Sequence, residues 1–240
     1  METQELIVKT GPMEGQKITV ATPNAASVWR VKTMFTKEPD TISWISSMAP
    51  GEVFFDVGAN MGLYSLYAAF HGLKVYAFEP HAQSYALLVQ NIQINGLSEH
   101  VKAYCVALTK KTEWSTLYMS DRKAAGSLSN FGEKRNFRKE VSDFKDSQGC
   151  YGTRIDDLPW NPDHIKVDVD GIEEKVVLGA MEKLKGVKSI LVEINGNLQE
   201  HREITEVLYG MGFKTDEEQV NSARRTEGPF ANVGNMIFKR

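Results

Sequence analysis

The stretch VFFDVGANMG, residues 53–62, joins a short apolar run to an acid and two glycines. Four of the five residues in 53–57 are apolar, as in a strand that is buried on both faces of a parallel sheet. Gly58 and Gly62 carry no Cβ, so the backbone between them can turn sharply and approach a ligand closely. Residues 63–70 then have the pattern of a helix that ends near Gly72. The stretch therefore predicts a strand, a ligand-binding loop and a helix.

Strand and helix patterns continue to alternate along the rest of the chain. Further strands are predicted at 74–78, 101–108, 165–169, 189–194 and 233–238, and helices at 40–48, 80–95, 173–184 and 198–211. This alternation predicts an α/β fold with a doubly wound, mostly parallel sheet. Residues 1–30 hold two short β-like runs around Gly11 and Pro12, so we expect a small N-terminal β appendage before a main domain at 31–240.

One region, residues 120–149, breaks the alternation. It is dense in charged residues, Ser and Gly, and it has few apolar positions. Loops of this length inside compact domains are usually either functional or disordered. We therefore predict a mobile loop, which serves either as a lid or as a solvated insertion.

The composition excludes several classes of protein. A net charge of -3 gives no overall field that attracts nucleic acid. No apolar run approaches the roughly 20 residues that a membrane helix needs, and the first fifteen residues lack the apolar core of a signal peptide. The two cysteines, Cys105 and Cys150, cannot form a disulfide framework. We expect a soluble, cytoplasmic protein without a membrane span, and the oligomeric state stays open.

An acid at the end of the first strand, Asp56, distinguishes between two nucleotide-linked cofactors. The loop is not G-x-G-x-x-G, because Ala59 and Asn60 follow Gly58. A carboxylate here repels the pyrophosphate of NAD but attracts the ammonium and sulfonium groups of S-adenosylmethionine (SAM). Glu79 ends the second strand, where a carboxylate accepts hydrogen bonds from the ribose hydroxyls of either cofactor. Charge therefore favours SAM.

With these residues in place, the chain resembles the FkbM family of SAM-dependent methyltransferases. The matching segments are 54–65, 77–80, Asn91 with 95–97, 155–158 and 165–173. The resemblance implies a Rossmann-like class I methyltransferase sheet that transfers a methyl group to a hydroxyl of a sugar, polyketide or similar small molecule. The family usually has Glu where Asp170 stands, which puts a direct ligand role for Asp170 in doubt. The predicted cofactor-binding residues are Asp56, Gly58, Ala59, Asn60, Met61, Gly62, Glu79, Pro80 and Ala107.

Two acids, Asp168 and Glu193, are the predicted catalytic pair, because they lie near the carboxyl ends of the fourth and fifth strands. Methyl transfer needs aligned reactants, and a hydroxyl acceptor must also lose its proton. We expect one acid to accept this proton and the other to orient the hydroxyl. The alternative is that Asp168 caps the following turn and Glu193 pairs with a cation. A divalent metal bound with Asp170 is not favoured, because no histidine accompanies these acids.

Three other functions are compatible with parts of the sequence. They are an NAD-linked oxidoreductase, a non-catalytic SAM-binding or nucleotide-binding module, and an RNA or protein methyltransferase. Asp56 and the missing G-x-G-x-x-G disfavour the first. Only the basic run 134–139 favours RNA, and Glu140, Asp143 and Asp146 largely cancel its charge. We therefore predict a small hydroxylated substrate and no nucleic-acid partner.

Overall fold

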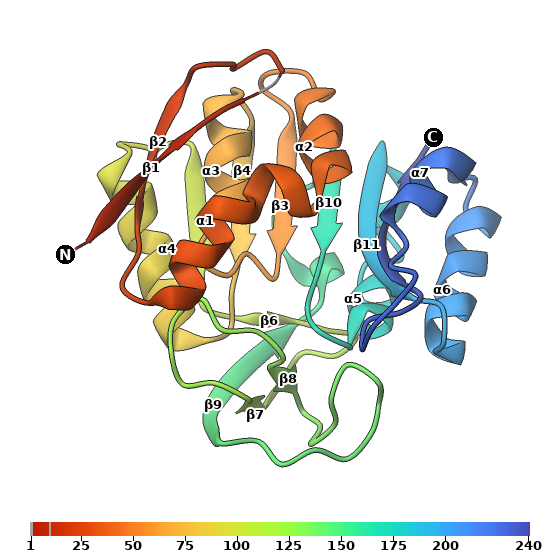
Figure 1. The fold of residues 1–240 in the computed structure, drawn as a ribbon. Coiled ribbons are helices and arrows are strands. Elements are labelled where there is room, and N and C mark those ends of the chain that lie inside the picture. Colours follow the sequence, from red (N-terminus) through yellow and green to blue (C-terminus); the bar gives the residue numbers. More distant parts are fainter. Residues whose placement is uncertain (1, 10) are drawn as a thin grey trace.

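A seven-stranded sheet runs through the middle of the protein, seen here in a computed structural model that describes residues 2–9 and 11–240 (Figure 1). In spatial order its strands are β12 (Lys214–Thr215), β13 (Val233–Lys239), β11 (Ser189–Asn195), β10 (His164–Val167), β3 (Val53–Val57), β4 (Lys74–Phe78) and β5 (Val101–Tyr104). The strands from β11 to β5 are parallel, and β13 is antiparallel to both of its neighbours. The predicted doubly wound α/β sheet is confirmed. Its strand order reverses between β3 and β10, which is where such sheets bind ligands at their carboxyl ends.

Helices cover both faces of this sheet. One face carries α1 (Ala25–Lys37), α2 (Pro39–Ser46), α3 (Leu63–Phe70) and α4 (Ala82–Ile94). The other face carries α5 (Glu173–Leu178) and α6 (Gln199–Gly210), while α7 (Glu217–Ala223) lies along β13. Two single 3₁₀ turns occur at Ile155–Asp157 and Lys183–Lys185. Within the described residues, no helix combines the length and the apolar character needed to cross a membrane.

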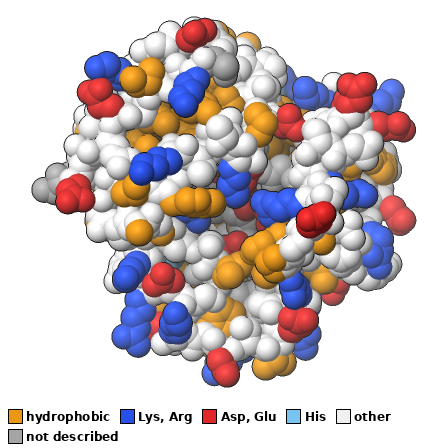
Figure 2. Space-filling view, in the orientation of Figure 1, with side chains coloured by type: hydrophobic (Ala, Val, Ile, Leu, Met, Phe, Trp, Pro, Cys, Tyr) orange, Lys and Arg blue, Asp and Glu red, His pale blue; other side chains and the backbone are white. Residues whose placement is uncertain are grey.

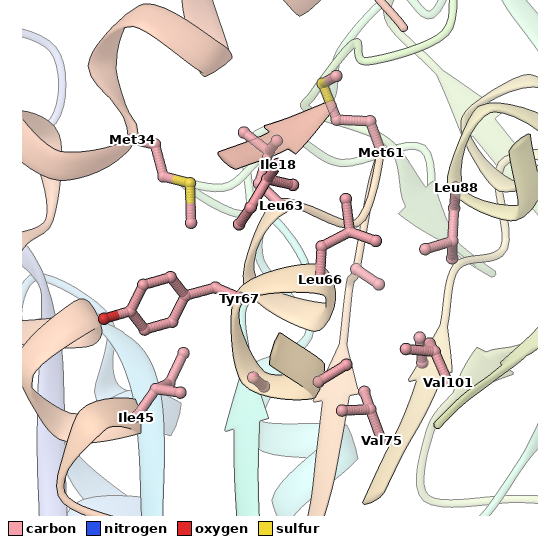
Figure 3. Packing of buried hydrophobic residues seen from close by; sticks show 14 of the residues in the cluster. Ile18, Met34, Ile45, Met61, Leu63, Leu66, Tyr67, Val75, Leu88 and Val101 are labelled. Atoms are coloured by element: carbon pink, nitrogen blue, oxygen red, sulfur yellow. The ribbon is translucent and has the colours of Figure 1, made fainter. Parts of the chain in front are cut away.

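The core on the first face joins the N-terminal elements to the sheet. Figure 3 shows Met34 of α1 and Ile18 close to Leu66 and Tyr67 of α3, and all four side chains are buried. Shortening such a residue, for example Leu66→Ala, typically costs about 2–5 kcal/mol of stability. The packing therefore fixes α1 against the sheet rather than leaving it as a free extension.

The N-terminal hairpin pairs β1 (Thr3–Ile7) with β2 (Lys17–Ala21) and docks on α4. Asn91 Oδ1 accepts the Ala21 N–H at 2.8 Å, and Asn95 accepts the Thr19 N–H at 2.9 Å. Residues 1 and 10 of the predicted appendage lie outside the described residues. The division of the chain at residue 30 stays a prediction, and α1, which the sequence did not predict, crosses it.

A second sheet lies below the carboxyl ends of the central strands in Figure 1. Its strands, in spatial order, are β6 (Ala107–Leu108), β9 (Asp146–Thr153), β7 (Glu113–Met119) and β8 (Asn130–Phe131). The predicted strand 101–108 is wrong as one element, because the chain leaves β5 after Tyr104 and pairs next with β9. The predicted loop 120–149 contains β8 and the start of β9, while its mobility stays a prediction.

Candidate active site

The loop between β3 and α3 is shaped by glycines with positive φ. Gly58 has φ +80°, and a Cβ on it would lie 1.9 Å from the carbonyl oxygen of Asp168. Any side chain here would push the loop away from the end of β10. On the other side, the buried Asn91 donates from Nδ2 to the Met61 carbonyl at 2.8 Å. The loop is thus held between β10 and α4.

Glu79 follows β4 and presents its carboxylate to this loop. Oε2 accepts the Asn60 N–H at 2.8 Å, and Oε1 accepts the His81 N–H at 2.9 Å. The side chain is buried, and burial raises the pKa of Glu79 to about 7 in spite of the two N–H donors. Because each carboxylate oxygen can accept a second hydrogen bond, Glu79 is able to bind two neighbouring hydroxyls.

A first cavity, of about 660 Å³, opens beside Glu79. Val106, Ala107 and Phe131 form part of its apolar wall, and Asp170 adds a second carboxylate. The predicted loop 120–149 also contributes to the lining, with Asp121, Gly126, Ser127 and Ser129. Figure 2 shows a hollow in the middle of the face of the molecule that it presents, with acidic side chains inside the hollow and Lys and Arg side chains near its rim. An apolar wall beside a few fixed polar groups is typical of a small-molecule site.

Asp56 of β3 forms an ionic triad with Lys166 and Asp168 at the end of β10. Lys166 Nζ donates to Asp168 Oδ2 at 2.9 Å and lies 3.9 Å from Asp56 Oδ1. Burial alone would raise the pKa of Asp168, but the charges of Lys166, Lys37 and Arg30 together outweigh it and hold this pKa below its usual range. Asp56 is completely buried and accepts a hydrogen bond from Ser65, and burial raises its pKa. Asp168 alone of the triad's acids reaches a cavity wall.

Asp170 sits in a strained turn just after the triad. Its φ is +61°, a conformation that non-glycine residues rarely adopt and that often marks functional sites. Its Oδ2 accepts the Leu128 N–H at 2.6 Å, which ties the turn to the loop above the first cavity. Burial and the charge of Asp168 raise the pKa of Asp170 to about 6.

Glu193, the second predicted catalytic acid, lies on β11 with its carboxylate 3.6 Å from Arg225. Burial and the neighbouring Asp168 raise the pKa of Glu193 well above its usual range. It lines neither the first cavity nor the second cavity described next. The structure therefore brings Asp168 to the cavity walls but not Glu193.

A second cavity, of about 500 Å³, adjoins the first and shares Gly58, Asn60 and Asp168 with it. The predicted cofactor-binding residues divide between the two. The first cavity is lined by Gly58, Asn60, Glu79, Pro80 and Ala107, and the second by Gly58, Ala59, Asn60 and Met61. Asp56 and Gly62 line neither. Gly62 instead packs under α4, since a Cβ on it would lie 2.4 Å from Leu88 Cδ1.

Several residues that line the second cavity were not predicted from the sequence, among them Arg30, Lys37, Tyr64 and Lys166. Lys166 has a visible signal, because it interrupts an apolar strand, and its ammonium lies 5.1 Å from the Tyr64 ring centre. Arg30 and Lys37 are seven residues apart and share one face of α1. That relation is visible only once residues 25–37 are known to be helical.

A buried cluster of Glu173, Glu174 and His201 has the composition of a metal site, but its hydrogen bonds argue against one. His201 Nδ1 accepts the Asn195 N–H at 3.0 Å, so the neutral ring carries its proton on Nε2. Burial lowers the pKa of His201 to about 4, which keeps the ring neutral. Nε2 faces both glutamates, at 3.4 and 3.8 Å, and has no lone pair to give to a metal. The donor set therefore does not fit a metal ion.

Comparison with known sequences identifies relatives along most of the chain. The model of the methyltransferase FkbM domain matches residues 56–215. The hexuronic acid methyltransferase AglP of Haloferax volcanii is 23% identical over 225 residues, which cover 90% of this chain and 89% of AglP. The 31-O-demethyl-FK506 methyltransferase FkbM of Streptomyces tacrolimicus is 26% identical over 205 residues, which cover 72% of this chain and 76% of that protein.

Comparison with solved structures identifies the same fold. A methyltransferase FkbM from Methylobacillus flagellatus matches 92% of this chain with a TM-score of 0.53 and 14% identity, and this chain spans 56% of that protein. The magnesium protoporphyrin IX methyltransferase of Synechocystis, solved with bound SAM, has a TM-score of 0.54 and 11% identity over 92% of this chain and 86% of its own. Both are Rossmann-like α/β proteins, so these matches confirm the fold class.

Proposed function

The chain belongs to the FkbM family of SAM-dependent methyltransferases, and from this we propose that it methylates a hydroxyl of a small molecule such as a sugar or polyketide. One relative is named for a hexuronic acid and the other for an O-demethyl compound, which favours an oxygen acceptor. The family membership argues against the alternatives of an NAD-linked oxidoreductase and a non-catalytic binding module. We keep as predictions that the acceptor is not a nucleic acid and that the protein is cytoplasmic.

The residues of the first cavity fit the adenosine part of SAM. Glu79 has free lone pairs for the two ribose hydroxyls, and Val106, Ala107 and Phe131 offer an apolar wall to the adenine ring. The triad fits the sulfonium. When Asp56 and Asp168 are both ionised, the triad has a net charge of -1, and Asp56 Oδ1 has no hydrogen-bond partner. A cation near Asp168 would offset this net negative charge.

We assign the proton-accepting role to Asp168. SAM supplies a methyl group on sulfur that is already activated for transfer, so the protein has to align the acceptor and remove its proton. Asp168 lines both cavities, and Lys166 keeps it ionised at neutral pH. The acceptor hydroxyl becomes strongly acidic as its oxygen gains the methyl group, so a carboxylate with a low pKa suffices to take the proton at Oδ.

Glu193 and Asp170 take supporting places in this proposal. Burial and the neighbouring acids raise the pKa of Glu193, and its carboxyl group lies 3.6 Å from Arg225, so we propose that it positions this arginine rather than the acceptor. Asp170 is the competing base, because its pKa of about 6 is close to the value that general bases need. The pH dependence of kcat separates the two acids. If Asp168 is the base, kcat should stay constant across the range around pH 6. If Asp170 is the base, kcat should fall as the pH drops below its pKa of about 6.

The observation that carries the proposal is the position of Asp168 on the shared wall of the two cavities. A labelled-methyl transfer assay over a panel of sugars, lipids and polyketides tests it. We expect transfer to a hydroxylated acceptor by the wild type and loss of transfer in Asp168→Asn. Transfer only to RNA, to protein or to no acceptor of the panel would contradict the proposed function. Addition of a chelator should leave the activity unchanged.

A further inference from the structure

The first cavity lacks a group that SAM requires. Among the described residues that line it, every charged side chain is a carboxylate, namely Glu79, Asp121, Asp168 and Asp170. These acids suit the hydroxyls and positive charges of SAM. The methionine part of SAM, however, also ends in a carboxylate, which four acids would repel. A cationic site for this end of the cofactor must therefore lie beyond the first cavity.

The second cavity supplies cations directly next to the first. Arg30, Lys37 and Lys166 line it together with the acids Glu38 and Asp168, and the two cavities meet at Asp168. Lys166 is already engaged by the acids of the triad. Arg30 and Lys37 come from α1 and both lower the pKa of Asp168, so their charges act at the shared wall.

Arg30 is held in place before any ligand arrives. Its Nε donates to the Ala125 carbonyl at 2.9 Å, and its Nη2 donates to the Gly126 carbonyl at 3.3 Å. Its remaining Nη1 is not used in these two bonds. A guanidinium that is fixed on one side presents its other donors to a carboxylate with little loss of side-chain freedom.

Lys37 lies two turns further along the same face of α1. Its ammonium contacts Glu38 at 2.5 Å and lies 6.0 Å from the centre of the Trp29 ring. The lysine side chain is 38% exposed and that of Glu38 is 9% exposed, so the lysine end of this ion pair is the one that is open to water. Arg30 thus offers a fixed donor and Lys37 a movable one.

We propose that Arg30, assisted by Lys37, binds the α-carboxylate of the methionine part of SAM in the second cavity. The adenosine part then occupies the first cavity. Sulfur joins these two parts of the cofactor, so it belongs at the shared wall, beside Asp168. This assignment makes α1, which precedes the matched family domain, a working part of the cofactor site. It rests on the SAM-dependence of the family and does not depend on which acceptor is methylated.

A pair of ligands tests this carboxylate site without any activity measurement. S-adenosylhomocysteine (SAH) has the amino-acid tail, whereas 5′-methylthioadenosine has the same adenosine and sulfur without it. By calorimetry on the full chain, wild type should bind SAH more tightly by at least about tenfold, the scale of a charge-assisted hydrogen bond. Arg30→Gln should lose most of this preference and Lys37→Gln a smaller part. Lys32→Gln removes a charge from α1 outside both cavities and should change neither affinity.

Three results would overturn the inference. One is equal affinity of wild type for the two ligands. Another is a full preference for SAH in both Arg30→Gln and Lys37→Gln. The third is an equal loss of affinity for both ligands in Lys37→Gln. The contacts of Lys37 are with Glu38 and not with the loop at 125–126. An equal loss would therefore mean that Lys37 shapes the site without binding the carboxylate. The transfer assay with acceptors is separate, so failure here leaves the proposed O-methylation intact.

Discussion

The ends of β4 and β10 each place a carboxylate beside the first cavity, yet the surroundings of the two carboxylates are opposite. Glu79 is held by two backbone N–H groups, and burial raises its pKa to about 7. Asp168 is held by the Lys166 ammonium at 2.9 Å, and its pKa stays below the usual range. One acid is close to losing its charge at neutral pH, and the other keeps it.

This difference indicates which part of a ligand each strand end recognises. A carboxylate fixed by backbone donors, with lone pairs left over, is suited to hydroxyls, whose donated hydrogen bonds stabilise its charge. A carboxylate in a triad with net negative charge is suited to a cation. SAM has both features, a ribose diol and a sulfonium. The end of β4 therefore fits the ribose diol of SAM, and the end of β10 fits its sulfonium.

The largest expected effect is on stability and comes from the ionic triad at the end of β10. Lys166→Met leaves Asp168 and the buried Asp56 without their cation, and breaking a buried ion pair such as Lys166–Asp56 costs about 3–5 kcal/mol. Urea unfolding followed by circular dichroism measures this. The matched double variant Lys166→Met with Asp56→Asn should recover part of the loss. A single variant as stable as the wild type would mean that the triad does not hold the end of β10.

The next effect is on turnover. Asp168→Asn keeps the shape of the side chain but removes the proton acceptor, so kcat should fall by about 10²-fold or more, the usual contribution of a general base. Single-turnover methyl transfer with saturating SAM measures it. Glu193→Gln is the matched control on the neighbouring strand and should retain most of the activity, because Glu193 lines neither cavity. Equal losses in the two variants would restore Glu193 as a direct partner of the acceptor.

A smaller effect is expected on cofactor affinity when Glu79, at the end of β4, is replaced. Glu79→Ala removes the acceptor for the ribose diol and should weaken SAM and SAH alike by about 1–3 kcal/mol. Calorimetry with both ligands measures the change. An unchanged affinity for either ligand would exclude Glu79 from the cofactor site.

The smallest effect is a proton that is released when the cofactor binds. The pKa of Glu79 is about 7 in the free protein, and hydroxyl donors lower it by favouring the charged form. Binding of SAH should therefore release part of a proton near about pH 6.5, and none at about pH 8.5, where the carboxylate is already ionised. Calorimetry in two buffers of different ionisation heat measures the release. Glu79→Gln should abolish most of it; if the release persists in full, Asp170 is its source.

The sequence predicted the parts of the fold that depend on local patterns. Residues 63–70 and 74–78 form α3 and β4 with the predicted bounds, because apolar periodicity and glycine ends determine both. The strand expected at 101–108 divides into β5 and β6, since the pairing with β9 is a long-range contact that no local pattern reveals. For the same reason the helix 25–37 and the second sheet were not predicted.

The candidate site, like the fold, was predictable only in the parts that follow from local sequence patterns. Glu79 and the glycines followed from their places at strand ends, and the structure brings Glu79 and Gly58 to one cavity. Asp56 was expected to face the cofactor, but its side chain is buried beneath Lys166 and reaches neither cavity. The sequence placed an acid near the loop, but the orientation of its side chain depends on a lysine from a strand more than a hundred residues away. The roles of these residues stay predictions.

The most direct test of the account compares the affinities of SAM and SAH, which differ by the methyl group and its positive charge. If Asp168 recognises this charge, calorimetry should show that Asp168→Asn weakens SAM much more than SAH, while Glu79→Gln weakens both to the same extent. If Asp168→Asn leaves the ratio of the two affinities unchanged, the end of β10 does not recognise the sulfonium, and the assignment of charge to one strand end and hydroxyls to the other is wrong.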